Sequence, residues 1–372
     1  MTMAEKAKTI ENFRSQVPPL ADENVTFLNS SFQPPMNKIV SNAIETYVQE
    51  GLYGLNPKPT WIAQCENVRS NIARHLNADP DDMVFTRDTT ESCNLFQRLL
   101  KFKSGNNVVL LRGEHPNQTS GCYNANTFAD AVDANTIAIG ISSVMFHSGL
   151  RNDIKSICDL YRPKGIHVLV DATQEVGFGK IDVKSLGVSA LAFGIHKGLA
   201  CPTGLGLLYI DPMVLSDLKA TPPIMSAGSL SNIEGELITP VPFTCFESAK
   251  RFEHLNKAVL QCLVLGKYLD FINSVGIENI QEHLENLGLY LRSELGAIGV
   301  KTVGPNNKKL RSPQSNVLEL KSPEWLPFFI ENCVYVSQYR GRVRASLGLY
   351  NSKDDVDKFV DIVRKGLDAG LQ

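Results

Sequence analysis

Short apolar runs alternate with helical stretches along most of the chain, and this alternation constrains the fold more than any other feature. The middle of the sequence carries strand-like runs, which are NNVVLLRG (106–113), TIAIGIS (136–142), HVLVDATQ (167–174), ALAFGIHK (190–197) and GLGLLYI (204–210). Strands that alternate with helices form a mostly parallel sheet covered on both faces. The pattern therefore predicts an α/β fold, with a ligand crevice just past the carboxyl ends of the strands.

The order of predicted helices and strands changes near residue 256, where two helical stretches (256–273 and 276–297) precede several short strands. The strand candidates are KTVGP (301–305), SNVLELK (315–321), CVYVSQ (333–338) and RVRASLG (342–348), and a helical run ends the chain. At 372 residues the chain exceeds one compact core. We therefore expect a large domain over 25–255, a smaller α+β domain over 256–372, and a segment 1–24 that packs on the small domain.

Composition and charge exclude several classes of protein. The net charge of −2 gives no reason to expect nucleic acid or an anionic membrane as a partner. No apolar run reaches the roughly 18 residues of a membrane span, and the polar start MTMAEKAKTIENFRSQ does not resemble a secretory signal. None of the eight cysteines forms a CxxC pair, so no metal site is expected. These features predict a cytoplasmic protein with reduced thiols.

Polar residues that can hold a pyridoxal cofactor follow the predicted strands. Asp171 and Gln174 follow HVLV, and His196-Lys197 follow ALAFGI. Such a cofactor needs a lysine amine, a carboxylate against the pyridine nitrogen, a bond to the ring 3-oxygen, a stacked planar side chain and a phosphate cup. A helix that begins at Thr89-Thr90 offers N–H groups and hydroxyls for the phosphate.

Each of these residues has an ordinary structural interpretation when it is considered alone. Lys197 would be a surface lysine, Asp171 a turn residue and the Thr89-Thr90 pair a helix cap. His115 would be a structural histidine, and Arg344 an ion-pair partner. Their combination and order favour the cofactor interpretation.

The run VLVDATQEVGFGKIDVKSLGVSALAFGIHKGLACPTGLGLLYI (168–210) resembles the class V aminotransferase superfamily, which includes cysteine desulfurases, isopenicillin-N epimerase and the C–S lyase of ergothioneine biosynthesis. The most specific parts are D-x-x-Q, His-Lys 23 residues after the glutamine, and the late R-x-S-x-G-x-Y-N. The resemblance covers nearly the whole chain. It implies pyridoxal 5'-phosphate and a fold of the aspartate-aminotransferase type, with a mostly parallel seven-stranded sheet in the large domain.

The resemblance also implies a role for each matching residue. Lys197 would form the Schiff base and then serve as the proton-transfer base. The other catalytic and cofactor contacts would come from Asp171 (pyridine nitrogen), Gln174 (3-oxygen), His115 (ring stacking), and Thr89, Thr90, His196 and Asn256 (phosphate). Arg344 would bind the substrate α-carboxylate with a bidentate fork, with Asn29 beside the substrate. A homodimer with shared active sites is implied as well.

Three positions depart from the family pattern. The interval CVYVSQYRGRVR has no cysteine on the short loop before Arg344, where desulfurases carry their nucleophile, and Cys333 stands 11 residues earlier. Gly194 replaces a serine or threonine that often binds the phosphate. Asn256 replaces a threonine that reaches the phosphate of the neighbouring subunit.

The missing cysteine makes a lyase the leading hypothesis for the reaction. Lys197 would remove the α-proton of a cysteine-derived amino acid, and a β-leaving group would depart. The alternatives are an epimerase or other biosynthetic enzyme acting on a larger amino acid, a cysteine desulfurase, and a non-catalytic binding protein with this fold.

Overall fold

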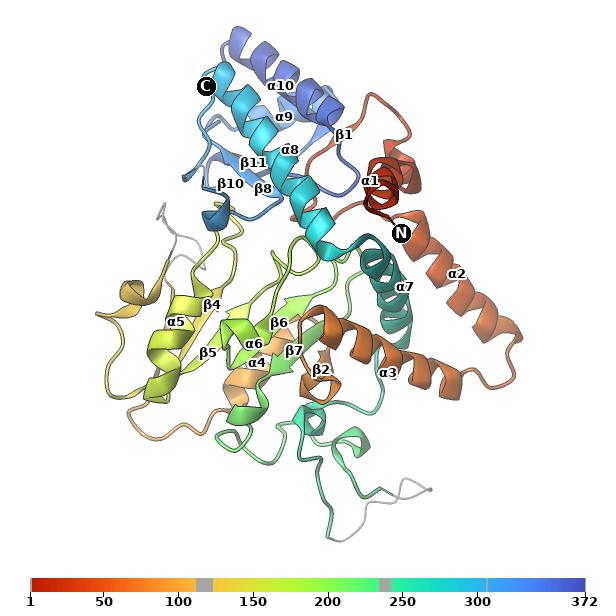
Figure 1. Ribbon diagram of the computed structural model, residues 1–372, viewed down its shortest axis with the longest axis vertical. Helices are drawn as coiled ribbons and strands as arrows, with labels where there is room; N and C mark the ends of the chain where they lie inside the picture. Colours follow the sequence, from red (N-terminus) through yellow and green to blue (C-terminus); the bar gives the residue numbers. More distant parts are fainter. Residues whose placement is uncertain (1, 112–122, 234–241, 306, 372) are drawn as a thin grey trace.

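A six-stranded sheet forms the centre of the computed structural model, which describes residues 2–111, 123–233, 242–305 and 307–371 (Figure 1). The spatial order is β2-β7-β6-β5-β4-β3. The strands are β2 (Met83–Thr86), β3 (Asn107–Leu110), β4 (Thr136–Ser142), β5 (His167–Asp171), β6 (Ala190–Gly194) and β7 (Gly206–Ile210). Strands β3 to β6 run parallel, and β7 is antiparallel to both of its neighbours. The predicted α/β class is confirmed, with six strands in the described residues where seven were expected.

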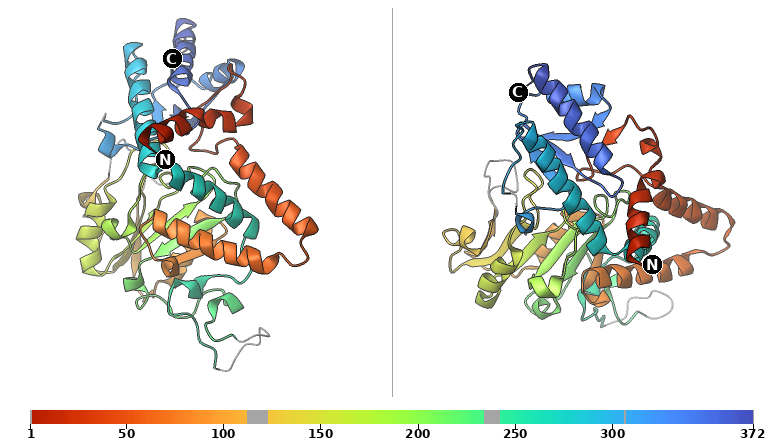
Figure 2. Two further views of the ribbon diagram at one scale, coloured as in Figure 1. Left: turned by 45° about the vertical axis from the view of Figure 1, so that its right-hand side comes forward. Right: turned by 45° about the horizontal axis from the view of Figure 1, so that its top comes forward.

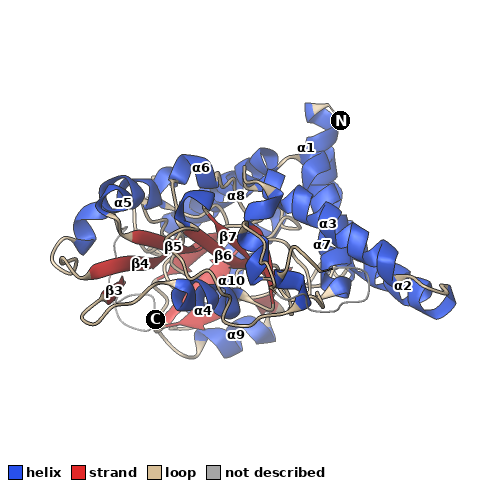
Figure 3. Cartoon of the chain, turned by 90° about the horizontal axis from the view of Figure 1, so that it is seen from below, coloured by secondary structure: helices blue, strands red, loops and turns tan. Residues whose placement is uncertain are grey.

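Helices cover both faces of this sheet, with α5 (Ile154–Tyr161) and α6 (Val183–Leu186) on one face and α4 (Thr89–Leu99) on the other (Figure 3). Successive side chains of a strand point to opposite faces. Phe193 accordingly belongs to the larger buried cluster, whereas Ala192 packs with Phe96 and Leu99 of α4. This two-sided burial explains why the central strands were recognisable as continuous apolar runs.

The N-terminal helices lie beside the sheet rather than over it. They are α1 (Met3–Glu11), α2 (Lys38–Tyr53) and α3 (Lys58–His75). Helix α7 (Val259–Val275) packs against α2 and α3. Figure 2 shows that α2 and α3 extend away from the sheet and meet at an outer corner. Three apolar side chains at this corner are exposed, namely Leu52, Tyr53 and Leu55.

The C-terminal part carries two small sheets. Strand β11 (Arg342–Ser346) lies between β10 (Ser337–Tyr339) and β8 (Ser315–Leu318) and is antiparallel to both. Strands β1 (Thr26–Phe27) and β9 (Val334–Tyr335) form a parallel pair. The helices of this part are α8 (Ile277–Ala297), α9 (Trp325–Glu331) and α10 (Lys353–Asp368). Arg14 contacts Asp355 of α10 at 2.9 Å, so the N-terminal segment is bonded to the last helix.

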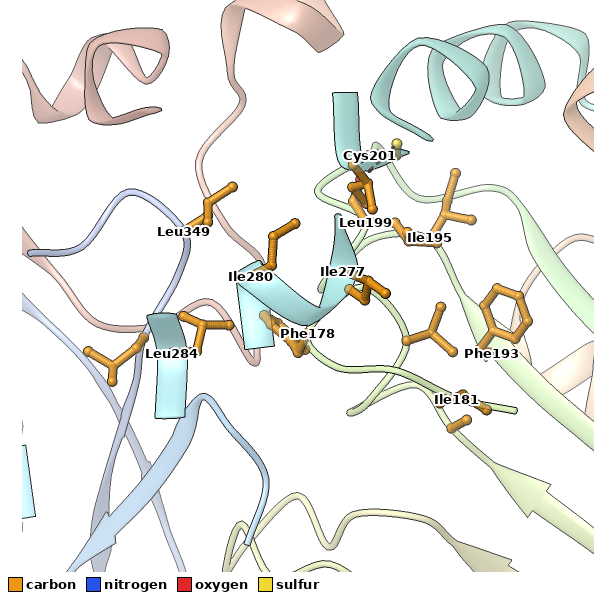
Figure 4. Packing of buried hydrophobic residues seen from close by; sticks show 14 of the residues in the cluster. Phe178, Ile181, Phe193, Ile195, Leu199, Cys201, Ile277, Ile280, Leu284 and Leu349 are labelled. Atoms are coloured by element: carbon orange, nitrogen blue, oxygen red, sulfur yellow. Dashed lines mark hydrogen bonds between the residues drawn. The ribbon is translucent and has the colours of Figure 1, made fainter. Parts of the chain in front are cut away.

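Buried side chains join α8 to the segment that follows β5. Phe178 and Ile181 of that segment lie near Ile277, Ile280 and Leu284 of α8 (Figure 4). All five belong to one continuous core cluster. This packing couples the C-terminal part to the edge of the large sheet where β5 ends.

The prediction of a strand over 301–305 is wrong. Only an isolated bridge between Thr302 and Leu318 forms there. Gly304 turns the chain with a φ of +82°, and Pro305 has no N–H for a ladder. Instead, the Arg311 guanidinium donates hydrogen bonds to the carbonyls of Val303, Gly304 and Pro305.

A buried ion pair next to β2 supports a stability prediction. The Arg69 guanidinium is 1% exposed and contacts the Glu253 carboxylate at 2.6 Å, and that carboxylate also accepts from the Phe85 amide. Glu253→Ala leaves the arginine buried without this partner, so we expect a loss of about 3–5 kcal/mol in the free energy of unfolding. Urea denaturation measures this loss in the free energy of unfolding.

The exposed Lys180–Glu278 pair is the control, and Glu278→Ala should cost under about 1 kcal/mol. Equal losses for both variants would contradict the prediction.

Candidate active site

The predicted site residues of β5, β6 and α4 meet at one edge of the large sheet. Asp171 ends β5 and is in register with Ala192 of β6, which leads to His196 and Lys197. Helix α4 starts at the same edge after β2, because Thr86, Gly206 and Gly194 lie in register across β2, β7 and β6. The structure therefore brings together residues that lie far apart in the sequence.

Lys197 is the amine at the centre of this edge. The pKa of Lys197 is lowered to about 8, mainly by burial and to a smaller extent by the positive charge of Arg344. The Asp171 carboxylate acts in the opposite direction on the same pKa. These interactions place Lys197 within electrostatic range of both groups and make the neutral amine accessible near physiological pH.

Hydroxyl and imidazole groups gather between the N-terminus of α4 and the end of β6. The Oγ1 atoms of Thr89 and Thr173 are 2.9 Å apart. Asp88 caps α4 by accepting from the Glu91 amide at 2.7 Å, which leaves the first amides of the helix for another acceptor. Burial, followed by the charge of Lys197, lowers the pKa of His196, so its imidazole is neutral at pH 7. Thr90 is exposed on the first turn of α4.

Gln174 lies buried beside the N-terminal segment. Its Nε2 donates to the Ser31 carbonyl at 3.3 Å, and its own carbonyl accepts from Nε2 of Gln314 at 2.8 Å. The bond to Ser31 holds the Gln174 side chain, and the bond from Gln314 holds the Gln174 backbone carbonyl.

Arg344 is buried on β11 with a polar partner on each side. Its Nη1 donates to the Phe146 carbonyl at 2.9 Å, and its Nη2 lies 3.4 Å from the Ser337 hydroxyl. The Ser337 hydroxyl in turn donates to Asn29 Oδ1. The guanidinium lies 4.6 Å from the Tyr339 ring centroid, while burial lowers the pKa of Arg344 to about 10.

The Nε of Arg344 is buried and has no hydrogen-bond partner among the residues that the structure describes. A buried donor without a partner is unfavourable, and an anion that binds this edge of the guanidinium would supply the missing acceptor. Asn29 reaches the arginine only through Ser337.

Two predicted residues remain. His115 lies outside the described residues. Asn256 is exposed and lines two surface cavities. One, of about 770 Å³, borders α2, α3 and α7; the other, of about 350 Å³, includes Arg87 and Glu91 at the start of α4.

Sequence reasoning missed four residues around the site, namely Thr173, Ser337, Tyr339 and Phe146. Thr173 had a usable signal, because it stands between Asp171 and Gln174 at a strand end. Ser337 and Tyr339 lie two residues apart on β10, the strand that pairs with the Arg344 strand β11. Phe146 binds through its backbone carbonyl, which no side-chain pattern reveals.

Comparison with known proteins decides the family. The model of the class V aminotransferase family matches residues 55–119 and 116–359. The chain belongs to the class V aminotransferase family. It is 48% identical to an uncharacterized aminotransferase of Schizosaccharomyces pombe, over 99% of this chain and 98% of that protein. It is 27% identical to a probable cysteine desulfurase of Methanothermobacter thermautotrophicus, over 77% of this chain and 75% of that one.

Solved structures share the fold of this class V enzyme. An apo cysteine desulfurase from Thermococcus onnurineus matches with a TM-score of 0.82 at 19% identity, covering 96% of this chain and 98% of that one. A cystine C–S lyase in complex with its product, cysteine persulfide, matches with a TM-score of 0.81 at 20% identity, covering 94% and 99%. The expected fold of pyridoxal-phosphate-dependent enzymes is confirmed.

The cofactor of this class V enzyme is pyridoxal 5'-phosphate, and the residues present fit it. Lys197 supplies an amine with a lowered pKa, and Asp171 supplies a nearby carboxylate. Gly194 lets the His196 and Thr89 side chains approach this point closely, since a Cβ there would lie 3.0 Å from His196 Nδ1 and 3.1 Å from Thr89 Oγ1. Among the described residues, no group of three or more His, Cys, Asp and Glu side chains could hold a metal ion. None of the described helices has the length and hydrophobicity needed to cross a bilayer.

The lowered pKa of Lys197 predicts how the apoprotein reacts with its cofactor. Only the neutral amine attacks an aldehyde, so the capture rate should rise roughly tenfold from pH 7 to pH 9 and then level off. Stopped-flow absorbance measures this rate. A rise that continues to pH 10.5, as for an exposed lysine, would contradict the prediction.

The same pKa sets the sign of a stability effect. The folded-state pKa of Lys197 lies below the model value of 10.5, so the unfolded chain binds more protons between about pH 8 and 10.5. The destabilising contribution of Lys197 is therefore present below pH 8 and disappears as the pH rises through that window.

Proposed function

We propose that the protein is a C–S lyase that cleaves cysteine-derived amino acids by β-elimination. The observation that carries this proposal is the turn between β10 and β11. Tyr339 pairs directly with Arg342, and the two turn residues, Arg340 and Gly341, have φ values of +52° and +67°. Such a two-residue turn leaves no loop that could present a cysteine beside Arg344.

Cys333 is poorly placed to replace the missing nucleophile. It precedes β9, four residues before Ser337, which is the register partner of Arg344. Four extended residues span about 13 Å. Cys122 lies outside the described residues. The cystine C–S lyase of the same fold, whose reaction product is cysteine persulfide, adds support.

In the proposed reaction each residue has a limited task. The bound cofactor supplies an electron sink for negative charge at the α-carbon. Arg344 binds the substrate carboxylate, and the neutral Lys197 amine takes the α-proton. Asp171 would keep the pyridine nitrogen protonated, and Gln174 would contact the ring.

Incubation with a panel of S-substituted cysteines and cystine tests the proposal. We expect pyruvate and ammonia in equal amounts, together with the released thiol or persulfide. Alanine with a protein-bound persulfide would indicate a cysteine desulfurase instead. Exchange of the α-proton with deuterium, without elimination, would indicate an epimerase or another biosynthetic enzyme.

A cytoplasmic homodimer is also proposed. The exposed Leu52, Tyr53 and Leu55 at the α2–α3 corner and the exposed Asn256 near the same helices support a partner subunit on this side. Seven cysteines are described, all as free thiols, which suits a reducing compartment. Light scattering after size exclusion tests the dimer, and a mass of 41.0 kDa, that of one chain, would contradict it.

A further inference from the structure

The end of β6 lacks a hydroxyl at residue 194, and a side chain there would be tightly packed against its neighbours. An ideal Cβ on Gly194 would meet His196 Nδ1 at 3.0 Å and Thr89 Oγ1 at 3.1 Å. A serine side chain extends beyond Cβ, so it would displace one of these two groups. Gly194 is therefore part of a different arrangement of hydrogen-bond donors and is not a simple loss of a phosphate-binding hydroxyl.

A threonine on the neighbouring strand brings a hydroxyl to the same place. Thr173 is 6% exposed, and its Oγ1 lies 2.9 Å from Oγ1 of Thr89. Its backbone amide donates to Asp171 Oδ1 at 2.9 Å. The amide of Ala172 donates to the Ala192 carbonyl at 2.8 Å, which fixes this segment against β6. Thr173 is thus held rigidly between Asp171 and Thr89.

We propose that Thr173 is a positioning residue for the cofactor phosphate, and that its hydroxyl, acting through Thr89, replaces the hydroxyl that is missing at Gly194. When Thr173 donates to Thr89, the Thr89 proton is free to point at a phosphate oxygen. A chain of hydrogen bonds from Thr173 through Thr89 to an anion is cooperative, because each bond polarises the next. The inference rests on the cofactor assignment and is independent of the reaction that the enzyme performs.

Isosteric variants separate the hydroxyl from the packing of this side chain. Thr173→Val keeps the shape and removes the hydroxyl, whereas Thr173→Ser keeps the hydroxyl. Dissociation constants of pyridoxal 5'-phosphate and of pyridoxal are measured by absorbance titration of the apoprotein. We expect Thr173→Val to weaken pyridoxal 5'-phosphate about tenfold and to change pyridoxal by less than twofold. Thr173→Ser should stay within threefold of the wild type for both ligands.

The comparison of the two ligands decides the outcome. Equal weakening of pyridoxal 5'-phosphate and pyridoxal by Thr173→Val would show a packing or folding defect and overturn the proposal, as would unchanged affinity for both. Lyase products play no part in this measurement. An error in the proposed reaction would therefore leave the result intact.

A double-mutant cycle with Thr89→Val tests whether Thr173 acts through Thr89. In the Thr89→Val background we expect Thr173→Val to weaken pyridoxal 5'-phosphate by less than twofold, because the bond it would lose is already gone. A tenfold effect in that background would mean that Thr173 acts independently of Thr89, which overturns the positioning role.

Discussion

Lys197→Ala should lose at least about a thousandfold in turnover, because the variant lacks both the amine that holds the cofactor and the base that moves the α-proton. The cofactor should still bind through its phosphate and ring contacts, but borohydride should no longer attach it to the protein. Product formation and mass spectrometry of the reduced protein measure the two losses.

Lys180 provides the matched control for Lys197. It is exposed and pairs with Glu278 on the surface, so Lys180→Ala should retain turnover and borohydride labelling. A Lys197→Ala variant that still becomes labelled, or that keeps a tenth of wild-type turnover, would show that another lysine holds the cofactor.

Arg344→Lys is expected to lower kcat/KM about 100-fold, mainly through a higher KM for the amino acid. Lysine keeps the positive charge but cannot offer the planar fork that binds a carboxylate through two bonds. It also cannot reach the Phe146 carbonyl and the Ser337 hydroxyl at the same time, as Nη1 and Nη2 do. Steady-state kinetics on an amino-acid substrate measure the change.

Arg342→Lys on the same strand is the control for Arg344. Its guanidinium pairs with Glu319, and both side chains are 34% exposed, so lysine can preserve the contact. We expect kcat/KM within threefold of the wild type. Equal losses in the two variants would indicate that the strand is generally sensitive and that Arg344 has no special role.

The sequence predicted the elements that carry Lys197 and Asp171 because those elements are buried on both sides. A continuous apolar run ending in polar residues is characteristic of a central parallel strand. Residues 301–305 (KTVGP) were also expected to form a strand, but pairing there is limited to one bridge, and Arg311 donates to three of the carbonyls. Local composition cannot reveal that the Arg311 side chain competes with strand pairing for these carbonyls.

The contact between Thr173 and Thr89 was beyond prediction for a different reason. It depends on how the end of β5 lies relative to the start of α4, 84 residues away in the sequence. The pattern identified both segments but not the orientation of their hydroxyls.

The parallel pairing of the N-terminal segment has a consequence for synthesis on the ribosome. The Ser346 amide donates to the Leu28 carbonyl, across 318 residues, and Asn29 is linked to Arg344 through Ser337. At 5–20 residues per second, the first part of the chain waits roughly 16–64 s for this partner to be made. Until residue 346 has been made, a nascent chain therefore lacks the carboxylate-binding half of the site and carries no active enzyme.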